Sequence, residues 1–163
     1  MLKDLARILL LCAAVLSSSA KQVEFTWTDC GSPTCHTVVN SVDVVPNPPV
    51  LGIPCNVTGH ALVDEPVTDG QITVAVKFSG LPVPVSPSQF SVCGVTVVKL
   101  PLNLGTITVH GLDCPSLAGN ISLSEIINIP KIAPLGTYDA KVSAIDQNGE
   151  ELLCLAAVIK IKA

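Results

Sequence analysis

The chain has 163 residues, of which 48% are hydrophobic and 13% charged, and its formal net charge is −4. This composition excludes a disordered chain, which needs low hydrophobicity and high charge, and the lack of any basic run argues against a nucleic-acid partner. Only 3% of the residues are aromatic whereas Val, Ile and Leu abound, a balance that favours strands over helices.

Residues 1–20 have the pattern of a secretory signal peptide. A weakly basic start precedes an apolar run at 8–16, which is far shorter than the roughly 20 residues that span a bilayer. Ser18 and Ala20 fit the small-residue cleavage pattern, so we expect a cut after Ala20 and one mature domain at 21–163. We therefore expect a protein that is secreted, or that reaches the lumen of a lysosome or vacuole through the secretory pathway.

The mature chain reads as a series of short strands. In the clearest one, 71–78, apolar residues at every second position alternate with polar ones, so one face is buried and the other solvated. The alternation recurs at 137–145 and 152–162, and no long stretch shows the period of an amphipathic helix. Strands are expected at about 23–28, 37–45, 56–63, 71–78, 95–100, 106–110, 121–128, 137–145 and 152–162.

Pro and Gly separate these strands. Asn148-Gly149 predicts a tight turn and hence a hairpin between the last two strands. The proline-rich pieces 46–49 and 81–87 are expected to be loops or sheet edges, because Pro lacks the N–H that a central strand needs. Short strands punctuated in this way, without an internal repeat, predict an all-β fold, an immunoglobulin-like antiparallel β-sandwich of two sheets.

Cysteines and acceptor motifs agree with a secreted chain. Cys12 lies in the signal peptide, which leaves six cysteines in an oxidising compartment and three disulfides as the expected state, with 15 pairings open. Asn56 and Asn120 each begin an Asn-X-Ser/Thr motif and are predicted to carry glycans.

Catalytic and metal-binding motifs are missing from the sequence. There is no nucleophile elbow, no His-Glu-x-x-His and no phosphate-binding glycine loop. The histidines His36, His60 and His110 are scattered, so no metal is expected. The carboxylate pairs 64–65 and 150–151 sit beside turns and are interpreted as solvated charge. We therefore expect neither an enzyme nor a bound cofactor.

An ordered set of motifs resembles the ML (lipid-recognition) family, which includes the Niemann-Pick type C sterol carrier and fungal phosphatidylglycerol/phosphatidylinositol transfer proteins. The resemblance spans essentially the whole mature chain. Its parts are Asp29-Cys30-Gly31, a Pro-Asn-Pro-Pro loop leading to Pro54-Cys55, Gly80-Leu81-Pro82-Val83-Pro84, Cys114-Pro115 followed by Ala118-Gly119, Pro134-Leu135-Gly136-Thr137-Tyr138 and Cys154.

The resemblance implies a set of disulfides. A long-range bridge would join Cys30 to Cys154, a second would join Cys93 to Cys114, and Cys35 would be left to pair with Cys55. The stretch 94–113 between the second pair is longer than the family usually has, and we expect it to form an extra hairpin.

The resemblance also implies an apolar cavity between the sheets, with the segment 80–85 at its entrance. The few aromatic residues leave room there for an acyl chain or a sterol. Each of two segments has a second interpretation that needs no ligand. Residues 126–130 are either the second side of this entrance or ordinary core. Residues 80–85 are either part of the entrance or a proline-stiffened loop over the core. The predicted lipid-binding residues are Val76, Phe78, Val83, Pro84, Val85, Ile126, Ile129, Pro130, Tyr138 and Leu155.

The expected function is a monomeric lipid carrier that delivers a sterol or phospholipid to a membrane or membrane-protein acceptor. The aliphatic lining favours acyl chains, and Lys131 is the nearest cation for a head group. Two alternatives stay open. One is a secreted protein-recognition module with a filled core, and the other is a lipid-dependent co-receptor with no transfer role.

Overall fold

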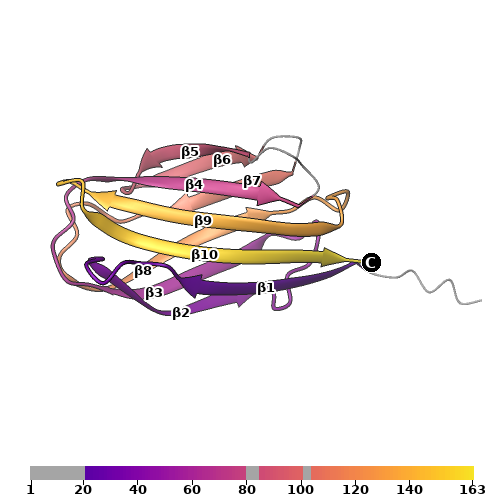
Figure 1. Cartoon of the computed structure of the whole chain (residues 1–163), viewed down its shortest axis with the longest axis horizontal. Helices are drawn as coiled ribbons and strands as arrows, with labels where there is room; N and C mark the ends of the chain where they lie inside the picture. Colours follow the sequence, from indigo (N-terminus) through magenta and orange to yellow (C-terminus); the bar gives the residue numbers. More distant parts are fainter. Residues whose placement is uncertain (1–20, 80–84, 101–103) are drawn as a thin grey trace, which may run out of the picture.

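The structure is a computed structural model that describes residues 21–79, 85–100 and 104–163. These residues form two five-stranded antiparallel sheets that stack face to face (Figure 1), in the orders β1-β10-β9-β4-β5 and β2-β3-β8-β7-β6. The predicted all-β, immunoglobulin-like sandwich is therefore confirmed. The strands are β1 (Gln22–Asp29), β2 (Thr37–Val45), β3 (Cys55–Val63), β4 (Gly70–Phe78), β5 (Val85–Ser91), β6 (Val95–Leu100), β7 (Gly105–His110), β8 (Gly119–Asn128), β9 (Gly136–Asp146) and β10 (Glu151–Lys162).

All nine predicted strands are present, and their bounds differ from the prediction by at most two residues. The tenth strand, β5, starts within the proline-rich piece 81–87. It pairs with β4 alone and so forms a sheet edge, the position in a sheet where proline is tolerated. Residues 46–49 lie between β2 and β3 and belong to no strand. Within the described residues, no helix has the length and apolar character needed to cross a membrane.

The core lies between the sheets in two clusters. The larger is built on alternating β4 residues such as Ile72 and Val74, which are buried as their spacing predicts. The smaller caps one end of the sandwich, called here the Tyr138 end, and consists of Val23, Leu51, Leu104, Ala133, Tyr138 and Ile161. The opposite end, called the His36 end, carries His36 and the turn between β9 and β10.

The β9–β10 turn confirms the predicted C-terminal hairpin. Gly149 adopts a φ of 82°, which a glycine tolerates without strain. The carboxylate of Asp146, itself only 3% exposed, accepts hydrogen bonds from the backbone N–H groups of Asn148 (2.9 Å) and Glu150 (2.7 Å) and from the Asn148 amide (2.8 Å). A buried carboxylate thus holds the turn closed.

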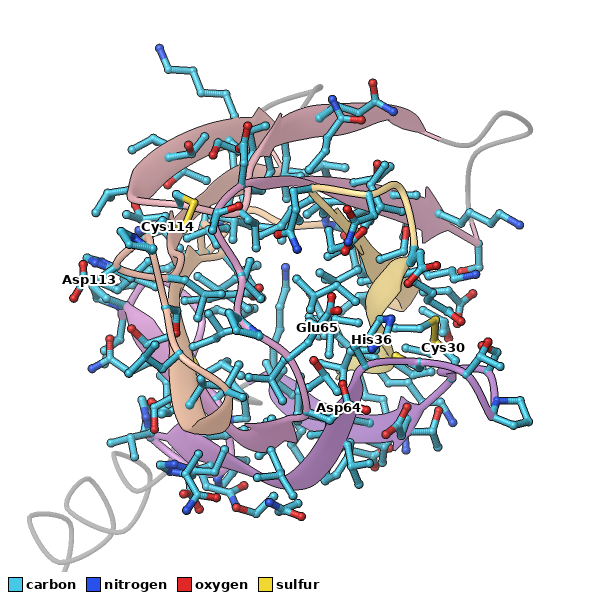
Figure 2. The ribbon with its side chains drawn as sticks, turned by 90° about the vertical axis from the view of Figure 1, so that its left-hand side faces the viewer. Cys30, His36, Asp64, Glu65, Asp113 and Cys114 are labelled. Carbon is cyan, nitrogen blue, oxygen red and sulfur yellow. A yellow bond between two sulfur atoms is a disulfide. The ribbon has the colours of Figure 1, made fainter. Side chains whose placement is uncertain are left out.

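Two of the three predicted disulfides are present. Cys30 is bonded to Cys154 across 124 residues, tying the end of β1 to β10. Cys93 is bonded to Cys114, and the stretch between them contains the expected extra hairpin, β6–β7. Both bridges lie toward the His36 end (Figure 2).

The predicted Cys35–Cys55 bridge is wrong. Thr37 pairs with Val63 and Val45 with Asn56, so Cys35 and Cys55 flank opposite ends of the β2–β3 ladder. The ladder keeps them roughly 25 Å apart at about 3.4 Å per residue, whereas a disulfide needs Cα atoms within about 7 Å. Both thiols are free, and burial raises the pKa of each, which keeps them protonated and unreactive.

Candidate functional site

Two apolar chambers lie between the sheets. Counted as space open to the centre of a water-sized sphere, one has about 70 Å³ and the other about 60 Å³, whereas a single water needs only about 10 to 15 Å³. The first, the Tyr138 chamber, is lined by residues of both sheets that include Val76, Leu104, Ile127, Ile129, Tyr138, Ala140, Ala157 and Ile161. The second, the Ile72 chamber, is lined by residues that include Val39, Val42, Ala61, Ile72, Val109, Leu123 and Leu153.

The chambers meet at a waist of four shared lining residues, Val57, Glu125, Val142 and Leu155. Three of them are aliphatic and one is a carboxylic acid. Glu125 lies on β8, and its neighbours two positions away, Leu123 and Ile127, pack into the core. Because side chains two apart on a strand point to the same face, the Glu125 side chain points between the sheets.

Glu125 is a functional candidate that the sequence analysis missed. Burial raises the pKa of its carboxyl, because the charged form loses its hydration in these apolar surroundings. Among the described residues, it has no hydrogen-bond or ion-pair partner. The signal was available, because in the predicted strand 121–128 the apolar residues Ile121, Leu123 and Ile127 define an inward face that includes position 125.

At the Tyr138 end, two aromatic rings close the chamber. Phe78 and Tyr138 stack with centroids 4.6 Å apart, and the Tyr138 hydroxyl donates a 2.9 Å hydrogen bond to the Pro134 carbonyl. Gly136, with a φ of 146°, permits this stack, since a Cβ there would lie 2.7 Å from the Phe78 ring. The rings thus form one rigid edge of the cavity.

A second hollow, called the polar hollow after its Lys99, Thr106 and Asn128 side chains although most of its lining is apolar, adjoins the Tyr138 chamber. It has a volume of about 450 Å³ on the same measure and shares Leu100 and Ile129 with the chamber. Its other lining residues are Gly52, Lys99, Gly105, Thr106, Asn128 and Pro130. The hollow therefore offers one cation and two neutral polar side chains next to an apolar cavity.

The predicted lipid-binding residues fall into three groups. Val76, Ile129, Tyr138 and Leu155 line the chambers, Phe78 stacks against Tyr138, and Pro130 lines the polar hollow. Val83 and Pro84 lie outside the described residues, and Val85 is described only by its backbone pairing with Val76 in β5.

Ile126, predicted to lie either at the entrance or in the core and to bind lipid, lines neither chamber. Its neighbours Glu125 and Ile127 both line the Tyr138 chamber, so the Ile126 side chain points to the opposite face of β8. The predicted glycan acceptors Asn56 and Asn120 are both exposed, as attachment of a glycan requires.

A second group of titratable side chains lies at the His36 end (Figure 2). His36 Nδ1 lies 2.9 Å from Asp64, and Nε2 lies 3.0 Å from Glu150 and 4.0 Å from Glu65. The hydrogen bonds to Asp64 and Glu150 raise the pKa of His36 to about 9. The sequence predicted that the carboxylate pairs 64–65 and 150–151 are simply solvated, whereas in the structure they supply the ion-pair partners of a charged His36.

These atoms of His36, Glu65 and Glu150 lie within 4.8 Å of one another, close enough to share a cation. Both ring nitrogens of His36 are already paired with carboxylates, however, and a protonated imidazole has no lone pair to offer a cation. His36 and Glu65 lie in loops that join the two sheets and Glu150 lies in the β9–β10 turn, so the cluster ties these segments together and has a structural role.

The fold and its interior define a class of protein, a β-sandwich with an apolar binding cavity between its sheets. Residues 24–161 match the family model for the ML domain, and the chain belongs to this family. Its members are binding proteins, and this chain is not an enzyme.

The chain is similar to "Putative phosphatidylglycerol/phosphatidylinositol transfer protein 2" of Dictyostelium discoideum, with 30% identity over 135 residues that cover 83% of this chain and 84% of the relative. Its fold is similar to that of chicken MD-1 complexed with lipid IVa, with a TM-score of 0.57, 13% identity and coverage of 85% and 89%. A Niemann-Pick type C2 protein from Japanese carpenter ant gives a TM-score of 0.54, 13% identity and coverage of 82% and 96%.

Proposed function

We propose that the chain is a lipid carrier that holds an acyl chain of an anionic phospholipid between its sheets. The observation that carries this proposal is the pair of aliphatic chambers joined end to end. Their predominantly aliphatic lining on both sides of the waist suits the flexible chain of a phospholipid. The name of the Dictyostelium relative points to phosphatidylglycerol and phosphatidylinositol as the ligand class.

Burial of the chain supplies the binding energy. Each methylene removed from water contributes about 0.8 kcal/mol, so a chain of a dozen buried methylenes offsets the cost of ordering it. The open chambers also argue against the alternative of a protein-recognition module, which would have a filled core.

The distribution of charge supports a negatively charged membrane as donor and acceptor. Lysines gather at the Tyr138 end, where Lys99 lines the polar hollow and Lys21 donates a hydrogen bond to the Ala133 carbonyl at 3.0 Å. The others are Lys77, Lys131, Lys160 and Lys162, of which Lys162 is paired with Glu24. Carboxylates gather at the His36 end, namely Asp29, Asp64, Glu65, Asp69, Asp113, Asp146, Glu150 and Glu151. Such a charge dipole turns the cavity end toward an anionic surface.

A secreted or lumenal location is part of the proposal. The signal-peptide pattern at 1–20 and the exposed acceptors Asn56 and Asn120 support it. The two disulfides also support it, because such bonds persist in oxidising compartments.

The test fills the cavity without changing the outer surface. Ala157 lines the Tyr138 chamber and Ala156 lies on the outer face beside Lys141, so Ala157→Phe and Ala156→Phe make the same change on opposite faces of β10. The secreted protein should carry phospholipid in native mass spectrometry and transfer labelled phosphatidylglycerol between vesicles.

Ala157→Phe should reduce binding and transfer at least tenfold, whereas Ala156→Phe should match the wild type. A wild-type protein that binds no phospholipid would contradict the proposal. Binding without transfer would favour the lipid-dependent co-receptor.

A further inference from the structure

The waist between the two chambers contains a carboxylic acid that pairs with none of the described residues. Glu125 lines both chambers, and its fellow waist residues Val57, Val142 and Leu155 are aliphatic. Among the described lining residues the other titratable group is Tyr138, whose hydroxyl is already bonded to the Pro134 carbonyl. The Glu125 carboxyl therefore faces the cavity as an open hydrogen-bonding group.

An unpartnered carboxyl in an apolar interior costs free energy, because its lost hydration is not replaced. A Leu or Val in its place would pack against the same walls at no such cost. Because no described residue pairs with it, a water or a polar atom of a bound ligand must satisfy Glu125, and a ligand that fills the chambers displaces that water. A neutral carboxyl both donates and accepts, so it matches a hydroxyl, which does the same.

The position of Glu125 sets where that hydroxyl must lie on the ligand. Ile129, four residues along the same chain, lines both the Tyr138 chamber and the polar hollow. Four residues of extended chain span about 13 Å. An extended hydrocarbon advances about 1.2 Å per bond, as a polypeptide backbone does, so the waist lies about 11 bonds from a head group in the hollow.

We infer that Glu125 is a specificity-determining residue, and that it favours lipids with a hydroxyl near the middle of an acyl chain over unsubstituted chains. Apolar space on both sides of the waist accommodates the two halves of such a chain. This inference rests on the proposed function, because it assumes that the chain of a lipid enters the chambers from the hollow.

The test compares three fatty acids by displacement of a fluorescent lipid from the purified full-length mature protein. Stearic acid has no hydroxyl, 12-hydroxystearic acid places one 11 bonds from the carboxyl carbon, and 2-hydroxystearic acid keeps it beside the head group. The wild type should bind 12-hydroxystearic acid roughly three- to tenfold more tightly than stearic acid, the range that one hydrogen bond supplies. It should bind 2-hydroxystearic acid and stearic acid alike.

Two variants assign this preference to Glu125. Glu125→Gln keeps a donor and an acceptor and should keep the preference, whereas Glu125→Leu should lose it while binding stearic acid at least as well as the wild type. Asp113→Leu removes an exposed carboxylate at the His36 end and should behave as the wild type.

The outcomes separate this inference from the proposed function. A wild type that binds stearic acid without preferring the 12-hydroxy acid would overturn the inference alone, as would a preference that survives Glu125→Leu. A wild type that binds neither fatty acids nor phospholipid would overturn both.

Discussion

The two ends of this sandwich are built in different ways. The His36 end is held by specific bonds, including two disulfides, the hydrogen-bonded Asp146 turn and the ion pairs of His36. The Tyr138 end and the chambers beside it depend on aliphatic packing and have few polar contacts, the Tyr138 hydroxyl being one of them. Stability and binding are thus divided along the long axis of the molecule.

The difference has a physical reason. A cavity that admits a ligand forfeits packing contacts, and each unfilled space weakens the fold by lost van der Waals attraction. Covalent and hydrogen-bonded constraints at the opposite end offset this loss without occupying the cavity. Substitutions at the His36 end should therefore change stability and leave lipid binding intact, whereas substitutions that line the cavity should change binding as well.

Removing the long disulfide should have the largest effect. The double variant Cys30→Ala/Cys154→Ala frees a loop of 124 residues, which the chain-entropy model values at about 4 to 5 kcal/mol. Urea unfolding should show a loss of that order. A variant that kept full stability would mean that the His36 end is not the main support of the fold.

Asp146→Ala should cause the second-largest loss of stability. It removes a buried carboxylate that accepts two backbone hydrogen bonds and one side-chain bond, at a cost of about 2 to 3 kcal/mol. Asp146→Asn keeps one acceptor oxygen and should cost less. Chemical denaturation measures both, and equal losses would argue against the hydrogen-bond account.

Tyr138→Phe should cost about 1 kcal/mol, because one hydrogen bond to the Pro134 carbonyl is lost while the ring stack with Phe78 remains. Unlike the two changes above, it touches the chamber wall. We expect a small change in phospholipid affinity as well, measured by displacement of a fluorescent lipid. An affinity identical to that of the wild type would separate the Tyr138 hydroxyl from binding.

The smallest effect should be the pH dependence due to His36, because the group is partly exposed and solvent screens its ion pairs. Its pKa is raised from 6.5 to about 9, so its stabilising contribution is complete below pH 6.5 and is lost as pH rises through 9. Thermal unfolding between pH 6 and 10 should show this fall in the wild type and not in His36→Gln. An identical fall in His36→Gln would mean that a group other than His36 causes the loss of stability.

Glu125 offers a contrast when the pH series is extended down to pH 4. Its pKa is raised by burial and not by partners, so its contribution to stability declines from about pH 4.5 upward, well before that of His36. Glu125→Gln should remove this earlier decline and leave the later one. If both declines in stability disappeared in Glu125→Gln, the cavity and the His36 end would be energetically coupled.

Local sequence pattern predicted the strands because alternation with a period of two marks both a strand and its buried face. Val76, Tyr138 and Leu155 line the chambers for this reason, and their predicted contact with lipid stays a prediction. The same alternation explains why Ile126 does not line the cavity, because it is one residue away from Glu125 and Ile127 and its side chain lies on the other face of the strand. Val83 and Pro84 lie outside the described residues, so their predicted roles stay predictions.

The sequence by itself determined which segments are strands, where the β9–β10 hairpin turns and which faces are apolar, because these depend on neighbours within a few residues. Only the tertiary structure decided that Cys35 and Cys55 lie at opposite ends of a ladder, that His36 meets carboxylates from two distant loops and that Glu125 stands at the waist of a cavity. These outcomes depend on register and sheet packing, which bring together residues that no local pattern relates.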